Sequence, residues 1–418
     1  MAQLGNDCFA PGQDLMTTAE ALAFIDQQIS PVAASERVPL AAAAGRILAE
    51  DIQARANVPP HDNAAVDGYA FRHADLAGTG KTRLTIVGRA AAGHPWNGPL
   101  GPGEAIRIFT GAVMPPDLDT VAMQEDCEAR DDTVAIPAGL AVGANRRHAG
   151  EDIATDTCIL RNGQILRPQD VGLAAAAGEA RLPVRAPLKV TVFSTGDEVI
   201  NPGRTLPPGA IHDSNRFALI ALLEGMGCRV RDLGILPDDK ATIAAALRTA
   251  VDDSDLVVTS GGVSVGEEDH VRGVVEQRGT LHFWRLAIRP GRPLALGQIG
   301  DTAFVGIPGN PVAVMVTFLI FVRPIIQRLA GARVTPPQRF PVAAAFSCRK
   351  KVGRREWMRA RLDGALGHFP AAQRFARDGA GIMTSMVESD GLIELGEDVA
   401  EVTQGDIVPF VPYSEVLP

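Results

Sequence analysis

The chain has 418 residues, of which 46% are hydrophobic and 21% are charged, a composition typical of a soluble, folded protein with roughly two to four domains. Its 40 lysines and arginines against 49 aspartates and glutamates give a net charge of −9. This charge argues against a general nucleic-acid binder, which needs a basic face, but leaves open a small anionic substrate held in a local basic pocket.

Cysteine, histidine and hydropathy patterns argue against several other classes of protein. The five cysteines are scattered and lack CxxC spacing, which predicts reduced thiols in a cytoplasmic protein. The eight histidines show no HExxH or paired spacing, which argues against a zinc site. We expect no signal peptide, and the longest apolar run, 312–322, is about half the length that a bilayer requires. We therefore expect a soluble cytoplasmic protein that binds neither membranes nor nucleic acid.

The N-terminal part of the chain begins with helical patterns and then changes character. A polar tail precedes a predicted helix over 19–29, and a second helix is expected to begin near Pro39 and to include 45–50. Prolines, glycines and short alternating runs then predict a small β domain. Mixed patterns return after it, with a small-residue helix expected over 171–178.

Residues 187–331 alternate regularly between strand and helix patterns. Such alternation predicts a doubly wound α/β domain, in which ligands bind where the strands end. The expected strands are 188–194, 228–233, 255–260, 281–288, 293–299 and 302–306, and the expected helices are 214–226, 239–251, 270–278 and 310–330. Short apolar runs beyond them predict a C-terminal β-barrel. The predicted domains are 1–54 with 146–186 (mixed α/β), 55–145 (small β), 187–331 (α/β) and 332–418 (β-barrel).

The most informative stretch is 255–269, DLVVTSGGVSVGEED. An apolar run typical of a buried parallel strand ends in a glycine-rich turn, whose backbone N–H groups can approach an anion closely. The candidate anion ligands in this turn are Ser260, Gly261, Gly262, Ser264, Val265 and Gly266. The carboxylates of Glu267, Glu268 and Asp269 follow, which suggests a phosphate ester handled with a divalent cation. Glycine-rich junctions also occur for packing reasons alone, and this alternative stays open.

Acidic side chains also follow two other predicted strands. The loop after strand 188–194 supplies Ser194, Thr195, Gly196, Asp197 and Glu198. Asp238 follows the next strand. A single acidic loop residue usually caps a helix or faces solvent, but three acidic sets at one sheet edge are costly without a cation. Magnesium fits because it takes oxygen ligands and bridges phosphate oxygens, so we predict a magnesium site formed by Glu198, Asp238 and Asp269.

Positive charge comes from the segment WRLAIRPGRP, 284–293. Strand alternation is expected to direct Arg285 and Arg289 to the same face, and Arg292 follows in a turn shaped by prolines and a glycine. Arginine forks bind phosphate or another oxyanion, whereas the alternative is a solvated cationic edge strand.

The helix expected over 310–330 has a clear N-terminal signal. Asn310 suits the N-cap and Pro311 the first helical position, directly after Gly309. The helix dipole favours an anion at this end, although simple capping explains the same residues.

The small β domain and the segment after it carry further polar motifs. They are DNAAVDGYA over 62–70, RIFTGA over 107–112 and NRRHAGED over 145–152. The last combines Arg147 with Asp152, a pairing of cation and carboxylate like that of the α/β domain. His148 is expected at the surface, and the cysteines have no base beside them in sequence, so we expect no thiol nucleophile.

These motifs together resemble one known family. The segments DNAAVDGYA, RIFTGA, NRRHAGED, FSTGDE, DSNR, TSGGVSVGEED, LAIRPGRP and GIPGNPV are similar, in this order, to those of the molybdopterin molybdenumtransferases, which include the bacterial MoeA proteins and the gephyrin E domain. The resemblance runs from about residue 15 to the end of the chain. The GGVSVG segment alone is shared with molybdopterin adenylyltransferases and competence-damage proteins, whereas all eight motifs in one order are specific.

The resemblance implies an enzyme that inserts molybdenum from molybdate into adenylylated molybdopterin, needs magnesium and releases AMP. It implies an elongated homodimer, with the small β domain of one chain as a lid over the α/β domain of the other. Contact with molybdopterin adenylyltransferase and with molybdoenzymes is a further expectation. The implied catalytic residues are Asp67, Asp152, Glu198, Asp238 and Asp269, and the implied binding residues include Thr110, Arg147, Pro308, Pro311 and Ser385.

The chain departs from the family pattern in two regions. The family often has lysines where this chain has Arg285, Arg289 and Arg292. Its QGS-type motif is replaced by the sequence DGA at 378–380, and a later asparagine by Asp390.

Two other functions stay open. An adenylyltransferase acting on the same pterin would need neither the small β domain nor the barrel, so the presence of both disfavours it. A non-catalytic scaffold or diverged paralogue is the other alternative, and the intact carboxylates count against it.

Overall fold

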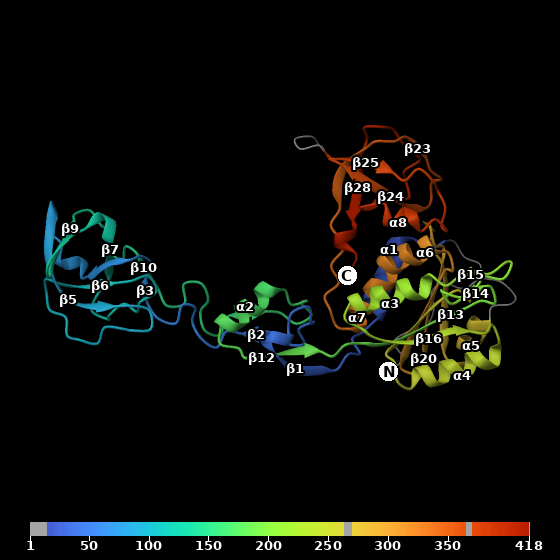
Figure 1. Cartoon of the computed structure of the whole chain (residues 1–418), viewed down its shortest axis with the longest axis horizontal. Helices are drawn as coiled ribbons and strands as arrows, with labels where there is room; N and C mark the ends of the chain where they lie inside the picture. The colour runs from blue at the N-terminus through green and yellow to red at the C-terminus, as the bar shows by residue number, and fades with distance from the viewer. Residues whose placement is uncertain (1–14, 263–269, 365–369, 418) are drawn as a thin grey trace.

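The structure is a computed structural model that describes residues 15–262, 270–364 and 370–417. They form an elongated molecule, with a β sheet at one end, a small connecting unit in the middle, and an α/β sheet and a barrel together at the other end (Figure 1). The predicted multidomain α/β and β fold class is confirmed, and the exact domain boundaries stay predictions.

The helix predicted at 19–29 is α1 (Thr18–Gln28), and its cap explains where it begins. The Thr17 hydroxyl accepts a hydrogen bond from the backbone N–H of Glu20, and the Glu20 carboxylate accepts one from the backbone N–H of Thr17. This capping box satisfies two N–H groups that the helix itself leaves free. The predicted helix is confirmed.

The second helix, expected from Pro39 onward, is wrong. Only a 3-10 turn forms there, at Leu40–Ala42, and the chain then bends at Gly45, whose φ of +77° favours glycine. Beyond the bend, Leu48 is fully buried and its backbone N–H donates to the carbonyl of Gln164 at 2.9 Å. Pairing with a distant segment replaces the helix because it satisfies the backbone and still buries the leucine.

Short antiparallel pairs build the connecting unit, in which β1 pairs with β12 and β2 with β11. Leu48, Leu166 and Leu182 form part of its core, on which helix α2 packs. The element bounds are β1 (Ser35–Pro39), β2 (Ile52–Gln53), β11 (Cys158–Leu160), α2 (Pro168–Ala176) and β12 (Arg181–Arg185).

The sheet at the far end has six strands in the order β7-β4-β6-β5-β9-β8. Two apolar clusters, one on each side of it, contain Ile106 and Phe71 respectively, and both side chains are fully buried. The bounds are β4 (Gly68–Phe71), β5 (Lys81–Ala90), β6 (Glu104–Ile108), β7 (Thr120–Met123), β8 (Glu128–Arg130) and β9 (Thr133–Pro137), with a separate pair of β3 (Asn63–Ala64) and β10 (Arg146–Arg147).

The α/β sheet has the order β16-β13-β17-β21-β20-β18. Its first four strands are parallel to one another, whereas β20 is antiparallel to both of its neighbours, β21 and β18. Helices α1, α3, α6 and α7 share one apolar cluster with the sheet, and α4 and α5 share another. The sheet is therefore covered on both faces, which explains why β17 is buried along its whole length. The bounds are β13 (Lys189–Thr195), α3 (Asn215–Gly225), β16 (Arg229–Leu236), α4 (Lys240–Val251), β17 (Leu256–Ser260), α5 (His270–Arg278), β18 (Thr280–Arg285), β20 (Pro293–Ile299) and β21 (Thr302–Ile307), with an excursion of β14 (Val199–Ile200) and β15 (Ile211–His212).

The helix predicted over 310–330 is a continuous run of α6 (Pro311–Thr317), a π-helical segment (Phe318–Val322) and α7 (Arg323–Leu329). Its 19 residues are long and apolar enough to cross a membrane, whereas the sequence expectation considered only the shorter run 312–322. Inside the structure 78% of its most apolar window is buried, as in the core helix of a soluble protein.

The C-terminal strands close into the predicted barrel, in which β24-β25-β22-β28-β26 is completed by pairing of β26 with β24. A further short strand, β19 (Ile288–Arg289), adds to β24 in parallel, so the segment between β18 and β20 belongs to the wall of the barrel. The barrel strands are β22 (Phe340–Ala344), β24 (Arg355–Asp363), β25 (Ala371–Arg374), β26 (Gly391–Leu395) and β28 (Ile407–Pro412), accompanied by β23 (Cys348–Arg349), α8 (Thr384–Val387) and β27 (Glu401–Val402).

The strand predicted over 281–288 is therefore wrong in part. It ends as β18 at Arg285, because the backbone of Ala287 turns to donate a hydrogen bond to the carbonyl of Met16 at 2.7 Å. Arg285 and Arg289 lie on different strands of different sheets, so strand alternation does not relate their side chains.

Candidate functional site

Three predicted loops meet at one edge of the α/β sheet because the parallel strands end in register. Ser194 in β13 pairs with Ser260 in β17, which in turn pairs with Ile307 in β21. Thr195 in β13 pairs with Leu236 at the end of β16. The loops that follow these strands are neighbours, as the doubly wound topology predicts.

Asn215, the first residue of α3, joins two of these loops. Its side-chain N–H₂ group donates to the Ser260 hydroxyl at 2.9 Å and to the Gly309 carbonyl at 2.6 Å. The Ser260 hydroxyl in turn donates to the carbonyl of Pro308 at 3.4 Å. Asn215 belongs to the DSNR motif but was not among the predicted site residues, since its link to both loops depends on the tertiary fold.

The described part of the glycine-rich turn is tightly packed. Gly262 has a φ of +63°, and a Cβ atom there would lie 2.7 Å from side-chain atoms of both Thr195 and Val271. Glycine is therefore required at this position for packing as well as for backbone conformation. The residues predicted in the rest of the turn lie outside the described residues, and they are Ser264, Val265, Gly266, Glu267, Glu268 and Asp269.

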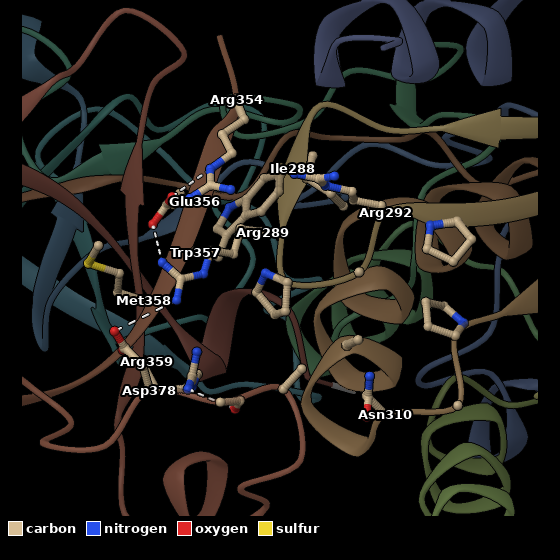
Figure 2. A pocket seen from close by; sticks show the side chains of 18 of the residues that line it. Ile288, Arg289, Arg292, Asn310, Arg354, Glu356, Trp357, Met358, Arg359 and Asp378 are labelled. Atoms are coloured by element: carbon tan, nitrogen blue, oxygen red, sulfur yellow. Dashed lines mark hydrogen bonds and ion pairs between the residues drawn. The ribbon is translucent and has the colours of Figure 1, made fainter. Parts of the chain in front are cut away.

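A cavity of about 450 Å³ opens between this sheet edge and the barrel (Figure 2). Seven of the predicted binding residues line it, namely Gly261, Gly262, Arg289, Arg292, Pro308, Gly309 and Asn310. The barrel side supplies charged residues that sequence reasoning missed, namely Arg354, Glu356, Arg359 and Asp378. Four arginines thus face two carboxylates, so the cavity carries net positive charge and suits an anionic ligand.

Arg289 lies between the two carboxylates, as Figure 2 shows. One terminal nitrogen of its guanidinium is 3.5 Å from Glu356 Oε2, and the other is 3.8 Å from Asp378 Oδ2. Glu356 is only 3% exposed and also accepts a hydrogen bond of 2.8 Å from Nε of Arg354, whose terminal nitrogen is ion-paired with the same carboxylate oxygen. The neighbouring Gly291 has a φ of +90°, and a Cβ there would be 2.5 Å from Thr317 Oγ1, so the turn can approach the helix closely.

Arg359 is a buried cation held by the α8 region of the barrel. Its Nε donates to the Ser385 hydroxyl at 2.9 Å, and one terminal nitrogen donates to the Gly379 carbonyl at 3.3 Å. Burial lowers the pKa of Arg359, and the nearby Asp378 carboxylate partly offsets this effect. Ser385 is fully buried and its hydroxyl donates to the carbonyl of Ile382, so it reaches the cavity through Arg359.

The start of α6 is in contact with the barrel. Asn310 occupies the N-cap position without a side-chain capping hydrogen bond, and Pro311 begins the helix. The backbone N–H of Val312 donates to the carbonyl of Ala380 at 2.8 Å. One N–H group at this helix end is thus already paired within the protein.

Two of the predicted metal ligands, Glu198 and Asp238, lie at the same sheet edge and outside the cavity lining, and the third, Asp269, is outside the described residues. Asp197 and Glu198 are both exposed. A Cβ atom at Gly196 would be only 2.7 Å from the Glu198 carboxylate, so this carboxylate lies directly beside the glycine. Asp238 accepts a hydrogen bond of 3.4 Å from the Thr195 hydroxyl. No group of three metal-ligating side chains occurs among the described residues. Two carboxylates at the ends of paired strands nevertheless fit magnesium, which needs only one or two beside phosphate oxygens.

The remaining arginine of the sequence prediction, Arg285, lies at the end of β18 and is exposed, and it does not line the cavity.

The other predicted residues lie away from the cavity, in the small β domain shown at one end of the molecule in Figure 1 and in the segment that joins it to the connecting unit. Asp67 accepts hydrogen bonds of 2.8 Å from both the backbone N–H and the hydroxyl of Thr110, which hold the pKa of Asp67 below its ordinary value. Arg147 is exposed and 3.9 Å from Glu151, and Asp152 is exposed. A single chain therefore does not bring these residues to the cavity.

Comparison with known proteins covers nearly the whole chain. Family models match as the MoeA N-terminal region (domain I and II) over 16–178, a probable molybdopterin binding domain over 191–328, and the MoeA C-terminal region (domain IV) over 341–413.

Individual relatives match at similar length. A molybdopterin molybdenumtransferase of Haemophilus influenzae is 36% identical over 409 residues, which cover 96% of this chain and 100% of the relative. Molybdopterin molybdenumtransferase 2 of Mycobacterium tuberculosis is 37% identical over 383 residues, 88% of this chain and 92% of the relative. The crystal structure of a molybdopterin biosynthesis moeA protein from Pyrococcus horikoshii OT3 matches with a TM-score of 0.83 at 30% identity, covering 96% of this chain and 100% of that one.

Proposed function

Because the chain belongs to the molybdopterin molybdenumtransferase family, we propose that it inserts molybdenum from molybdate into adenylylated molybdopterin and releases AMP. Both proposed substrates are anions, and bringing them together costs Coulomb energy. The observation that carries the proposal is the cationic cavity, in which Arg289, Arg292, Arg354 and Arg359 outnumber the carboxylates. Guanidinium groups fixed before the ligands arrive lower this cost without rearrangement during the reaction.

The loops at the sheet edge are suited to the phosphate end of the pterin substrate. Gly261, Gly262 and Gly309 allow a ligand to approach the backbone, and Asn215 links Ser260, the residue before these first two glycines, to Gly309. Loops held in this way position the substrate for reaction. Ser194 and Thr195 support the turn from beneath, since both are buried.

Magnesium is the proposed metal, held by Glu198 and Asp238, with Asp269 as a third candidate outside the described residues. When bound, it would neutralise charge on the phosphate oxygens beside the bond that breaks. The role of this chain's own residues is to present the two carboxylates at adjacent strand ends, where Thr195 holds Asp238.

A second copy of the chain is proposed to complete the site, as a homodimer. In one elongated chain, the small β domain and the segment after it lie too far from the cavity to contribute to it (Figure 1). A partner could supply the four predicted residues of this region, namely Asp67, Thr110, Arg147 and Asp152. Asp67 and Thr110 already form a rigid hydrogen-bonded pair. We further propose a cytoplasmic location and transient contact with the adenylyltransferase that makes the substrate and the molybdoenzymes that take the product.

The proposal is tested by incubating the purified full chain with adenylylated molybdopterin, magnesium and molybdate, and measuring AMP. We expect AMP release that requires both molybdate and magnesium. Replacement of Glu198 by glutamine is expected to lower the rate at least roughly a hundredfold, and Glu388→Gln, a change of the same kind at an exposed barrel residue, serves as the control. Pterin binding without AMP release would support the scaffold alternative, and pterin adenylylation with ATP would support an adenylyltransferase.

A further inference from the structure

A carboxylate of this chain lies among the arginines that would bind an oxyanion. Asp378 follows β25 and lines the cavity, with its side chain 45% exposed. Its Oδ2 is ion-paired with Arg374 and lies 3.8 Å from the guanidinium of Arg289. Burial lowers the pKa of Arg359, and the nearby Asp378 charge offsets part of this lowering. A negative group of the protein therefore already lies beside two of the arginines that would attract a bound anion.

The two carboxylates of the cavity differ in how they are held. Glu356 is 3% exposed and bound by Arg354 through a hydrogen bond and an ion pair, each of 2.8 Å, so it is a fixed counter-ion. Asp378 is half exposed, and its contact with Arg289 is an ion pair too long to be a hydrogen bond. A tetrahedral oxyanion can form closer, forked hydrogen bonds with the same guanidinium, and it would then repel Asp378.

Resting on the function proposed above, we propose that Asp378 determines the molybdate affinity of the cavity by competing with the oxyanion for Arg289. The residue weakens binding in two ways. It partly neutralises the positive charge of Arg289 and Arg359 before the ligand arrives, and it repels the divalent oxyanion once bound. The site then fills only at a higher concentration of molybdate than its four arginines alone would require.

The test compares molybdate binding by the full-length protein with that of three variants, measured by isothermal titration calorimetry without pterin at fixed ionic strength. In Asp378→Asn we expect the dissociation constant to fall roughly tenfold, the effect of removing one repelling charge near a partly exposed site. Asp378→Glu keeps the charge and is expected to bind within about twofold of the wild type. Asp363→Asn removes the same charge from the exposed end of β24, outside the cavity, and is expected to bind unchanged.

AMP release measured against molybdate concentration separates this inference from the proposed reaction. The molybdate KM should fall together with the dissociation constant in Asp378→Asn, whereas a purely structural lesion would lower kcat. Unchanged or weaker molybdate binding in a folded Asp378→Asn protein, or absence of molybdate binding in every variant, overturns the inference. If binding tightens as expected while no variant releases AMP, the affinity role stands and the proposed reaction fails.

Discussion

Asn215 shows how one neutral side chain can organise a charged site. Its amide group holds Ser260 and Gly309, which follow two different strands of the sheet. Two longer hydrogen bonds also join these loops, from the Ser260 hydroxyl to the Pro308 carbonyl at 3.4 Å and from the backbone N–H of Gly261 to the Ile307 carbonyl at 3.2 Å. Its effect on the proposed reaction is therefore one of positioning, since it acts through the loops.

Asn215→Ala is expected to lower kcat/KM for adenylylated molybdopterin about tenfold to a hundredfold, because the two hydrogen bonds that position the loops are lost. Thermal melting should show a folded protein. Asn162→Ala, at an exposed position of the connecting unit, is the matched control and should be neutral. Molybdate binding without pterin should be unaffected in both variants. An Asn215→Ala enzyme with unchanged kcat/KM would show that the loops hold their positions without this link.

At the scale of elements, the local signals that predicted the α/β sheet and α1 were reliable because each was sufficient alone. The apolar run of β17 and the capping box of α1 need no knowledge of the rest of the chain. The helix predicted from Pro39 failed because pairing of Leu48 with Gln164, far away in sequence, outweighed local propensity.

The same distinction explains which side of the site could be predicted. The loops after β13, β16 and β17 follow from the rule that parallel strands end at one edge. Arg354, Glu356 and Arg359 enter the cavity only because β19 pairs with β24, and Ile288 lies opposite Arg355. A two-residue strand has no pattern of its own in the sequence, so only the family resemblance, through Ser385, placed the barrel at the site, and it did not predict these three residues.

The capping box of α1 gives a prediction for stability. Thr17→Ala removes the hydroxyl that accepts from Glu20, and should lower the free energy of unfolding by ~1 kcal/mol. This loss corresponds to a decrease of roughly 2–4 °C in the melting temperature of a unit of this size, measured by circular dichroism. Thr249→Ala makes the same chemical change inside α4 and should be neutral or slightly stabilising, since alanine favours helix. Equal melting temperatures for both variants would rule out a role for the cap.

At the scale of the whole molecule, the predicted site residues fall into two groups that lie far apart in the elongated structure (Figure 1). The predicted carboxylates of both groups are present in the sequence, yet one chain cannot bring the two groups together. A symmetric dimer with two identical composite sites is the simplest arrangement that would do so.

Subunit complementation tests this arrangement. Asp67→Asn and Glu198→Gln should each be inactive in AMP release, because each removes one side of the composite site. After subunit exchange in an equal mixture, half of the dimers are mixed and each has one intact site, so activity should recover to about a quarter of wild type. Asp67→Asn mixed with Thr110→Ala should not recover, since both changes affect the same side. A monomeric mass in solution, or no recovery despite proven exchange, would contradict the shared site.

The short pairing of β19 with β24 has a mechanical consequence. The backbone N–H of Arg355 donates to the carbonyl of Ala287 at 2.8 Å. The segment that carries Arg289 is therefore hydrogen-bonded to strand β24 of the barrel. An outward movement of the barrel would either carry Arg289 with it or break this pairing, at about 0.5–1.5 kcal/mol for each hydrogen bond. The position of this arginine is therefore coupled to that of the barrel, so a displaced barrel would also change the charge that the sheet edge meets across the cavity.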